Sequence, residues 1–199
     1  MERLKACWIV VIMLLTGLPA RAVDCAVDVF ITTGVAIPVL RQAQVKAAAM
    51  FHEIGVDVRI RVGSAPHPGA GTCGEPIEIL LDDSTGYPGT ADALAYAEPF
   101  RESGSRVHIF VDRLVGRNRD PGFANILLAH VMVHEITHVL AQSVGHSESG
   151  VMKARWSRED YQCMKWHSLP FTREDVEGLR NSLAQRKDSS QRSKVARSE

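Results

Sequence analysis

A short motif, His134-Glu135-Ile136-Thr137-His138, has the residue types and spacing of a zinc site. In a helix of about 3.6 residues per turn, His134 and His138 project from the same face one turn apart, so both imidazoles can bind one ion. Glu135 is offset around the helix, where its carboxylate can accept a proton from water without binding the metal. The motif therefore predicts a metal site with a general base beside it.

A catalytic zinc usually has three protein ligands and a water, so a third ligand is needed. His130 continues the same helical face, but it lies eight residues before His138. That separation is about 12 Å along the helix axis, too far for both to bind one ion, and we expect His130 to be a buried or supporting histidine. His146 follows Gly145, where the chain can turn back, and is the favoured third ligand. Glu159, on a following helix, is the alternative.

The residues after His146 add a further feature, because Met152 follows in a glycine-containing turn. Together with HExxH, this pattern resembles the metzincin clan of zinc metallopeptidases, which have HExxHxxGxxH and then a tight turn carrying a methionine. Residues 134–156 are also similar to a group of short, exported, uncharacterised bacterial proteins. Ala141 stands where the clan has glycine, and the last histidine comes two residues late, so either the helix is longer or the loop bulges.

The resemblance implies a Zn2+ cofactor and zinc-dependent hydrolysis of peptide bonds. His134, His138 and His146 would be the ligands, Glu135 the general base, and Met152 a hydrophobic floor below the metal. In this mechanism Glu135 takes a proton from the attacking water and later delivers it to the leaving amine.

The resemblance also implies where a substrate binds, because extended peptides pair with the edge strand of the clan's sheet. The matching segment here is Leu94-Ala95-Tyr96-Ala97, which is also an ordinary edge strand in its own right. Trp156 and Tyr161 either line the pocket or pack in the core.

The predicted elements agree with this clan independently of the motif. Strands are expected at 27–33, 56–62, 77–81, 93–97 and 107–111, and helices at 38–54, 121–142 and 172–185. This order predicts an α+β fold with a mixed sheet of about five strands and an antiparallel edge strand. A backing helix, the active-site helix and a C-terminal helix complete it.

The two ends of the chain have different compositions from the centre. Residues 1–22 have a basic start, an apolar run of about ten residues and an Ala-Arg-Ala site, which is typical of a secretory signal peptide. The predicted peptidase domain spans 23–185, and 186–199 is expected to be a disordered, polar, basic tail. We therefore expect an exported protein, periplasmic or extracellular.

The overall composition narrows the choice of partners. Lys plus Arg and Asp plus Glu are both 23, so the net charge gives no indication of nucleic-acid binding. We expect a monomer that acts on a peptide or protein substrate, with no nucleic-acid partner and no stable membrane anchor.

Loss of Cys7 with the signal peptide would leave Cys25, Cys73 and Cys163. We expect one disulfide and one free thiol, with Cys25–Cys73 favoured among three pairings. A different class of function also fits the motif, namely a binding module stabilised by a closed zinc site, with Glu148 or Cys163 as the fourth ligand.

Overall fold

The computed structural model describes residues 25–33, 38–64, 72–84, 93–98, 105–117 and 121–196. Within these ranges the strands are β1 (Ala26–Thr33), β2 (Asp57–Val62), β3 (Ile77–Asp82), β4 (Ala95–Glu98) and β5 (Ser105–Phe110). The helices are α1 (Leu40–Glu53), α2 (Val111–Arg117), α3 (Pro121–Ala141), α4 (Arg158–Met164) and α5 (Arg173–Ala196). The expected signal segment 1–22 lies outside the described residues.

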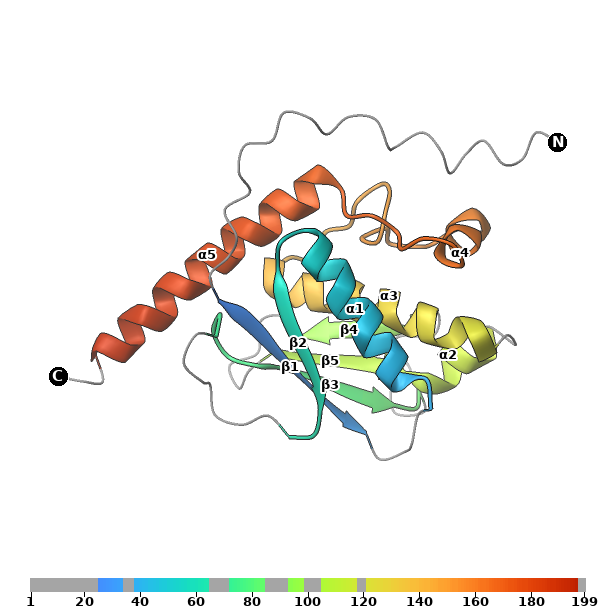
Figure 1. The fold of residues 1–199 in the computed structure, drawn as a ribbon, viewed down its shortest axis with the longest axis horizontal. Helices are drawn as coiled ribbons and strands as arrows, with labels where there is room; N and C mark the ends of the chain where they lie inside the picture. The colour runs from blue at the N-terminus through green and yellow to red at the C-terminus, as the bar shows by residue number, and fades with distance from the viewer. Residues whose placement is uncertain are drawn as a thin grey trace.

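The strands form one mixed sheet in the order β2-β1-β3-β5-β4. The first four are parallel, and β4 runs antiparallel to β5 at the edge. Helices α1 and α3 pack against each other over the sheet (Figure 1). The predicted α+β class, with its antiparallel edge strand, backing helix, long motif-bearing helix and C-terminal helix, is confirmed.

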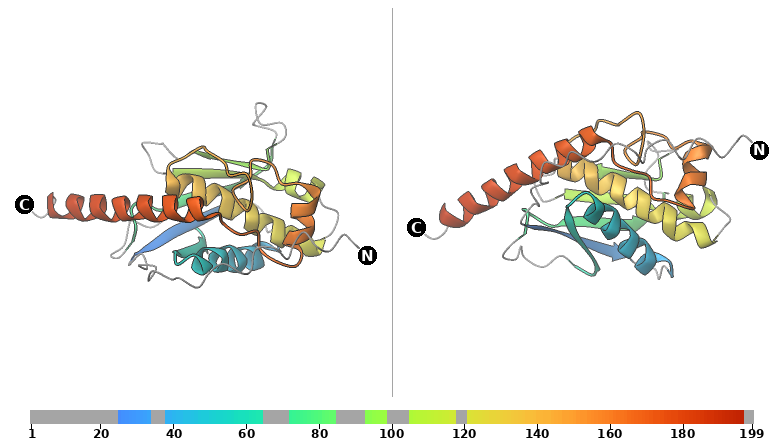
Figure 2. Two further views of the ribbon diagram at one scale, coloured as in Figure 1. Left: turned by 90° about the horizontal axis from the view of Figure 1, so that it is seen from above. Right: turned by 45° about the horizontal axis from the view of Figure 1, so that its top comes forward.

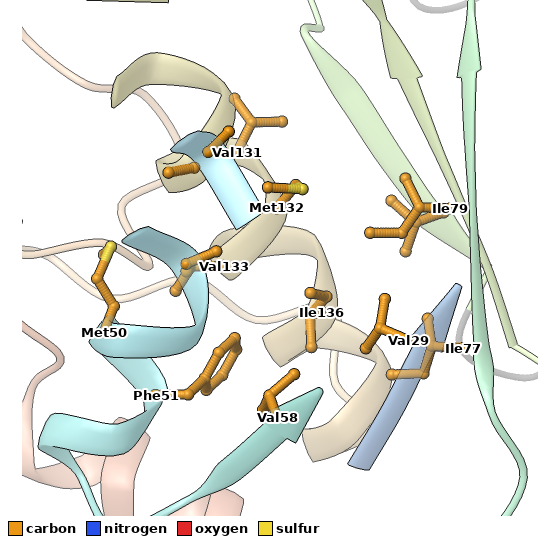
Figure 3. Close-up of a cluster of buried hydrophobic side chains, with 14 of the residues drawn as sticks. Val29, Met50, Phe51, Val58, Ile77, Ile79, Val131, Met132, Val133 and Ile136 are labelled. Carbon is orange, nitrogen blue, oxygen red and sulfur yellow. The ribbon is translucent and has the colours of Figure 1, made fainter. Parts of the chain in front are cut away.

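The core lies between the sheet and helices α1 and α3. In β3, Ile77, Ile79 and Leu81 are buried and alternate with half-buried residues, because successive strand side chains point to opposite faces. Figure 3 shows Ile77 and Ile79 in one cluster with Ile136 of α3 and Phe51 of α1. Each such side chain contributes about 1.5–3 kcal/mol when buried, so α3 is held firmly in place.

Helix α3 begins at Pro121, as predicted, since proline suits the first turn of a helix. Judged only by its length and composition, the segment Gly122–Ala141 of this helix could cross a membrane. However, 78% of its most apolar window is buried inside the protein, as expected for the central helix of a folded core.

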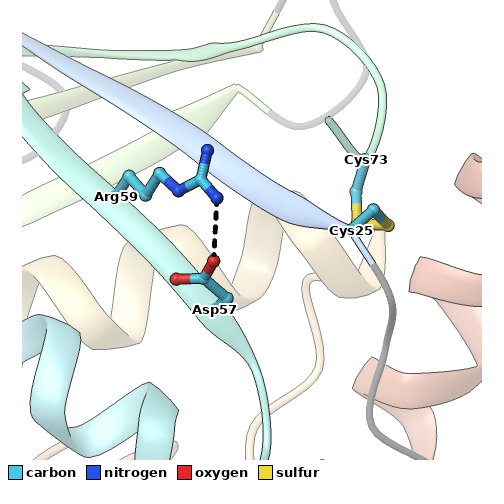
Figure 4. The surroundings of a disulfide bond; sticks show 4 residues. All are labelled: Cys25, Asp57, Arg59 and Cys73. Carbon is cyan, nitrogen blue, oxygen red and sulfur yellow. Dashed lines mark hydrogen bonds and ion pairs between the residues drawn. A yellow bond between two sulfur atoms is a disulfide. The ribbon is translucent and has the colours of Figure 1, made fainter. Parts of the chain in front are cut away.

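A disulfide joins Cys25, at the start of β1, to Cys73 in the segment before β3, which confirms the favoured pairing (Figure 4). The expected free thiol is not found in the full-length chain. Cys163 is also disulfide-bonded, and no described cysteine is free. The expectation of an odd cysteine count depended on the loss of Cys7, which lies outside the described residues.

The last helix is longer than predicted. It continues beyond Gln185 to Ala196, where a disordered tail was expected, and its C-terminal part projects beyond the sheet (Figure 2). Residues after Gln185 include several Arg, Lys and Gln, which are good helix formers. Arg186 also anchors this part of the helix, because its guanidinium donates to the carbonyl of Val139 at 2.6 Å.

Candidate metal centre

Helix α3 brings His134 and His138 together, as their spacing predicts. Their ring centroids lie 4.7 Å apart, and the two Nε2 atoms are separated by 3.0 Å. Both residues belong to the buried face of the helix, which the core fixes in position. The pair is therefore formed by a rigid element.

His146 joins this pair from the loop that follows α3. Its ring centroid lies 5.3 Å from that of His134 and 4.9 Å from that of His138. The potential ligand nitrogens of the three histidines all lie within 4.8 Å of one another. The structure thus brings together the three histidines that the sequence indicated.

The chain turns back earlier than expected. Helix α3 ends at Ala141, and Gln142 has the left-handed φ of 48° that commonly ends a helix, whereas Gly145 does not have a positive φ. The amide of Ser143 then donates to the carbonyl of His138 at 3.2 Å. The spacing between His138 and His146 is two residues longer than in the metzincin pattern. These two extra residues therefore lie in the loop and do not lengthen the helix.

The hydrogen bonds of the two helical histidines determine which nitrogen can bind a metal. Nδ1 of His134 donates to the carbonyl of Val151 at 2.9 Å, and Nδ1 of His138 donates to that of Ser143 at 2.8 Å. A carbonyl only accepts, so each Nδ1 carries the hydrogen and each Nε2 carries a lone pair. Backbone carbonyls orient metal-binding histidines in this way, and this donor set fits Zn2+.

Burial changes the ionisation of the site. It lowers the pKa of His134 to about 4 and also lowers the pKa of His138, which keeps both rings neutral near pH 7. The carboxyl of Glu135 is buried too, and burial raises its pKa to about 8. A positive charge nearby would favour the carboxylate form of Glu135.

His130 has a structural role, as the axial distance predicted. Its Nδ1 donates to the carbonyl of Ile126 at 2.7 Å, and its Nε2 accepts from the amide of Leu169 at 3.1 Å. Both ring nitrogens are therefore occupied by the backbone. His130 joins α3 to the segment before α5.

The alternative ligands are not part of the cluster. Glu159 lies exposed on α4, and Glu148 is exposed in the loop after His146. Cys163 does not lie in the cluster of potential metal ligands found among the described residues. Among the described residues, the group suited to a metal consists of the three histidines alone.

The segment after His146 is a tight turn packed against the core. The amide of Ser147 donates to the carbonyl of Met152 at 2.9 Å, and Met152 is only 3% exposed.

The backbone of the turn also requires a glycine. Gly150 has a φ of 76°, and a Cβ there would lie 2.2 Å from the carbonyl oxygen of Pro170. The indole of Trp156 donates to the same Val151 carbonyl that orients His134, at 3.3 Å.

The three histidines and Glu135 open into a cleft of about 660 Å³. Leu94, Ala95, Tyr96 and Ala97, at and beside the edge strand β4, line it, as do Trp156 and Tyr161. Other lining residues were not singled out from the sequence: Ala93, Val131, Val144, Lys153, Ala154 and Arg155. Trp156 and Tyr161 are half-buried, so they both pack on the core and line the cleft.

Sequence comparison finds no relative: no protein-family model matches the chain, and no curated protein does. Comparison of structures does find likenesses. An archaemetzincin from Methanopyrus kandleri superposes with a TM-score of 0.54 at 16% identity, over 85% of this chain and 99% of that one. An archaemetzincin from Archaeoglobus fulgidus, complexed with malonate, gives 0.45 at 16% identity, over 76% and 99%. The first likeness shows that this chain has an archaemetzincin-like fold.

Proposed function

We propose that this protein is an exported, zinc-dependent endopeptidase of the metzincin type. The observation that carries the proposal is the convergence of His134, His138 and His146, whose ligand nitrogens lie within 4.8 Å of one another. Three imidazoles are a typical set for a catalytic zinc, because they leave one position for water or substrate. The archaemetzincin-like fold supports the same assignment.

Zinc in this site would supply Lewis acidity, polarising a peptide carbonyl and making a water more acidic. Glu135 lines the cleft directly beside His134 in the sequence and is buried from bulk water. Its carboxylate accepts the proton of the attacking water and later donates it to the leaving amine. The neutral Nε2 atoms of His134 and His138 keep their lone pairs available for the metal.

The turn at 147–152 supports the assignment to metzincins. Met152 is buried in the hydrophobic core, and the backbone of the turn closes on Ser147, the residue after the third histidine. This burial supports the role that the resemblance implies for Met152, a hydrophobic floor below the metal.

We infer that the substrate binds as an additional strand along β4. This strand pairs with β5 on one side, and its residues line the cleft that contains the histidines. An extended peptide paired with an edge strand gains main-chain hydrogen bonds without a demand on its sequence. A non-cleaved peptide bound in the cleft should slow hydrogen exchange of the β4 amides, and unchanged exchange would contradict this binding mode.

Export is supported by the signal-like composition of residues 1–22 and by the Cys25–Cys73 disulfide, since such bonds form in oxidising compartments. The mature protein should therefore begin at Val23. N-terminal sequencing of the protein recovered from outside the cytoplasm checks this, and recovery of a chain that still begins at Met1 would contradict it.

Replacement of Glu135 by Gln tests the enzymatic function. We expect peptide hydrolysis to fall by about 10²–10⁴-fold, because the general base is lost while the three imidazoles remain. Zinc content and hydrolysis of a mixed peptide library are measured on the same preparation. Glu53→Gln, at an exposed position of α1, is the matched control and should keep full activity.

Two results would contradict the proposal. Near-normal hydrolysis by zinc-loaded Glu135→Gln would remove the proposed base. Absence of hydrolysis by the fully zinc-loaded natural sequence would favour the binding module.

A further inference from the structure

We propose that Asp175 and Ser147 together form a positioning device for His146, the third ligand. This inference rests on the proposed zinc site. It begins from a difference between the three histidines. His134 and His138 lie on a rigid helix with Nδ1 anchored to a carbonyl, whereas His146 is exposed on a loop. Within the described part of the chain, no hydrogen bond holds the His146 ring.

The loop is held instead at the next residue. The amide of Ser147 donates to the carbonyl of Met152 at 2.9 Å, and its hydroxyl donates to Oδ1 of Asp175 at 2.5 Å. The first bond ties the loop to the turn that follows it. The second ties it to α5, 28 residues further along the chain. Because the backbone at 147 is fixed from two sides, the position of the preceding residue, His146, is restricted.

Asp175 is well suited to this role because its own position is fixed. Its Oδ2 accepts from the amide of Thr172 at 2.9 Å, and its amide donates to the Thr172 hydroxyl at 3.1 Å. These two bonds form the capping box at the start of α5. The helix is then fixed to the core through Leu179 and Leu183, which are fully buried. The Asp175 carboxylate thus holds the loop at Ser147 against α5, which is itself fixed to the core.

The two roles of Asp175 use different oxygens, so they can be separated by mutation. Ser147→Ala removes the bond to Oδ1 and leaves the capping box intact. Thr172→Ala removes the hydroxyl that accepts from the Asp175 amide, but it keeps both hydrogen bonds of the Asp175 carboxylate, because the bond to Oδ2 comes from the backbone amide of residue 172. Ser147→Thr retains a hydroxyl and is the conservative variant.

The experiment measures zinc affinity by competition with a chromophoric chelator, beside urea unfolding of the metal-free proteins. We expect Ser147→Ala to bind zinc about 10-fold or more weakly, since groups that position metal ligands typically contribute a factor of 10–100. Ser147→Thr should restore most of that affinity. Thr172→Ala should unfold at lower urea concentration but bind zinc as the natural sequence does.

The inference is overturned if Ser147→Ala binds zinc within twofold of the natural sequence, or if Thr172→Ala weakens binding as much as Ser147→Ala. His146→Ala separates this failure from that of the proposed function. If His146→Ala loses affinity while Ser147→Ala does not, only the positioning role is wrong. If His146→Ala also binds zinc normally, the three-histidine site itself is wrong.

Discussion

The four histidines between positions 130 and 146 differ in role according to the partners of their ring nitrogens. His130 lies on the same helical face as His134 and His138, so periodicity alone does not separate them. The rise along the helix excludes His130 as a ligand with the other two, and its two backbone bonds give the physical reason for its presence. Residue types and spacing were sufficient to predict that His134, His138 and His146 would meet, and Glu135 lines the same cleft.

The burial of His130 makes the protein sensitive to acid. Burial lowers the pKa of His130 to about 4, against about 6.5 in the unfolded chain. Between these values only the unfolded chain takes up the proton, so the free energy of unfolding decreases as the pH falls from about 6.5 to 4. The loss is about 3 kcal/mol in total, and none arises above this range.

Urea unfolding of the metal-free natural sequence and of His130→Gln, at pH 7 and at pH 4.5, checks this prediction. The variant should lose less stability between the two pH values, whatever its stability at pH 7. His134 contributes equally in both proteins, because it is present in both. The same pH dependence in the two proteins would show that His130 is not the acid-sensitive group.

At the scale of elements, the strands and long helices were predictable, whereas the short helix α2 was not. The alternation in β2, the mostly apolar residues of β3 and the proline at the start of α3 predicted those elements directly. Helix α2 was missed because its seven residues are too few to show a helical period, and its first residue, Val111, has strand character. Helix α4 did have a signal, since Ser157 and Asp160 form a capping box.

The loop that carries His146 shows what the sequence could not provide. The residue with left-handed backbone conformation is Gln142 and not a glycine, so no residue type in the sequence indicates where the chain turns. The carbonyls that orient the ligands, on Ser143 and Val151, belong to the backbone and have no residue type that identifies them. The bond from Ser147 to Asp175 joins residues too far apart in the chain for a local pattern.

At the scale of the whole molecule, the hydrophobic core and a disulfide are sources of stability other than a bound metal. The buried residues of the sheet, α1 and α3 form one continuous hydrophobic cluster, and the Cys25–Cys73 disulfide ties the start of β1 to the segment before β3. The order of elements was enough to predict this architecture, because each strand and long helix has its own pattern of burial. The hydrophobic core and the disulfide therefore stabilise the fold independently of the three-histidine site.

Removal of the metal should accordingly leave the fold intact. We expect a chelator to abolish hydrolysis and to lower the melting temperature only through loss of bound ligand, which is worth about 4 kcal/mol when free zinc is a thousandfold above its Kd. Far- and near-ultraviolet circular dichroism should keep the folded signal at 25 °C. Unfolding on chelation at that temperature is the behaviour of a structural zinc module and would contradict this prediction.

The central claim is that His134, His138 and His146 hold one zinc ion with one position left for water. X-ray absorption at the zinc edge, on protein loaded with one equivalent, measures this coordination directly. We predict three imidazole nitrogens and one oxygen at about 2.0–2.1 Å, with one imidazole lost in His146→Ala. A sulfur ligand, a fourth protein ligand, or an unchanged spectrum in His146→Ala would contradict the claim.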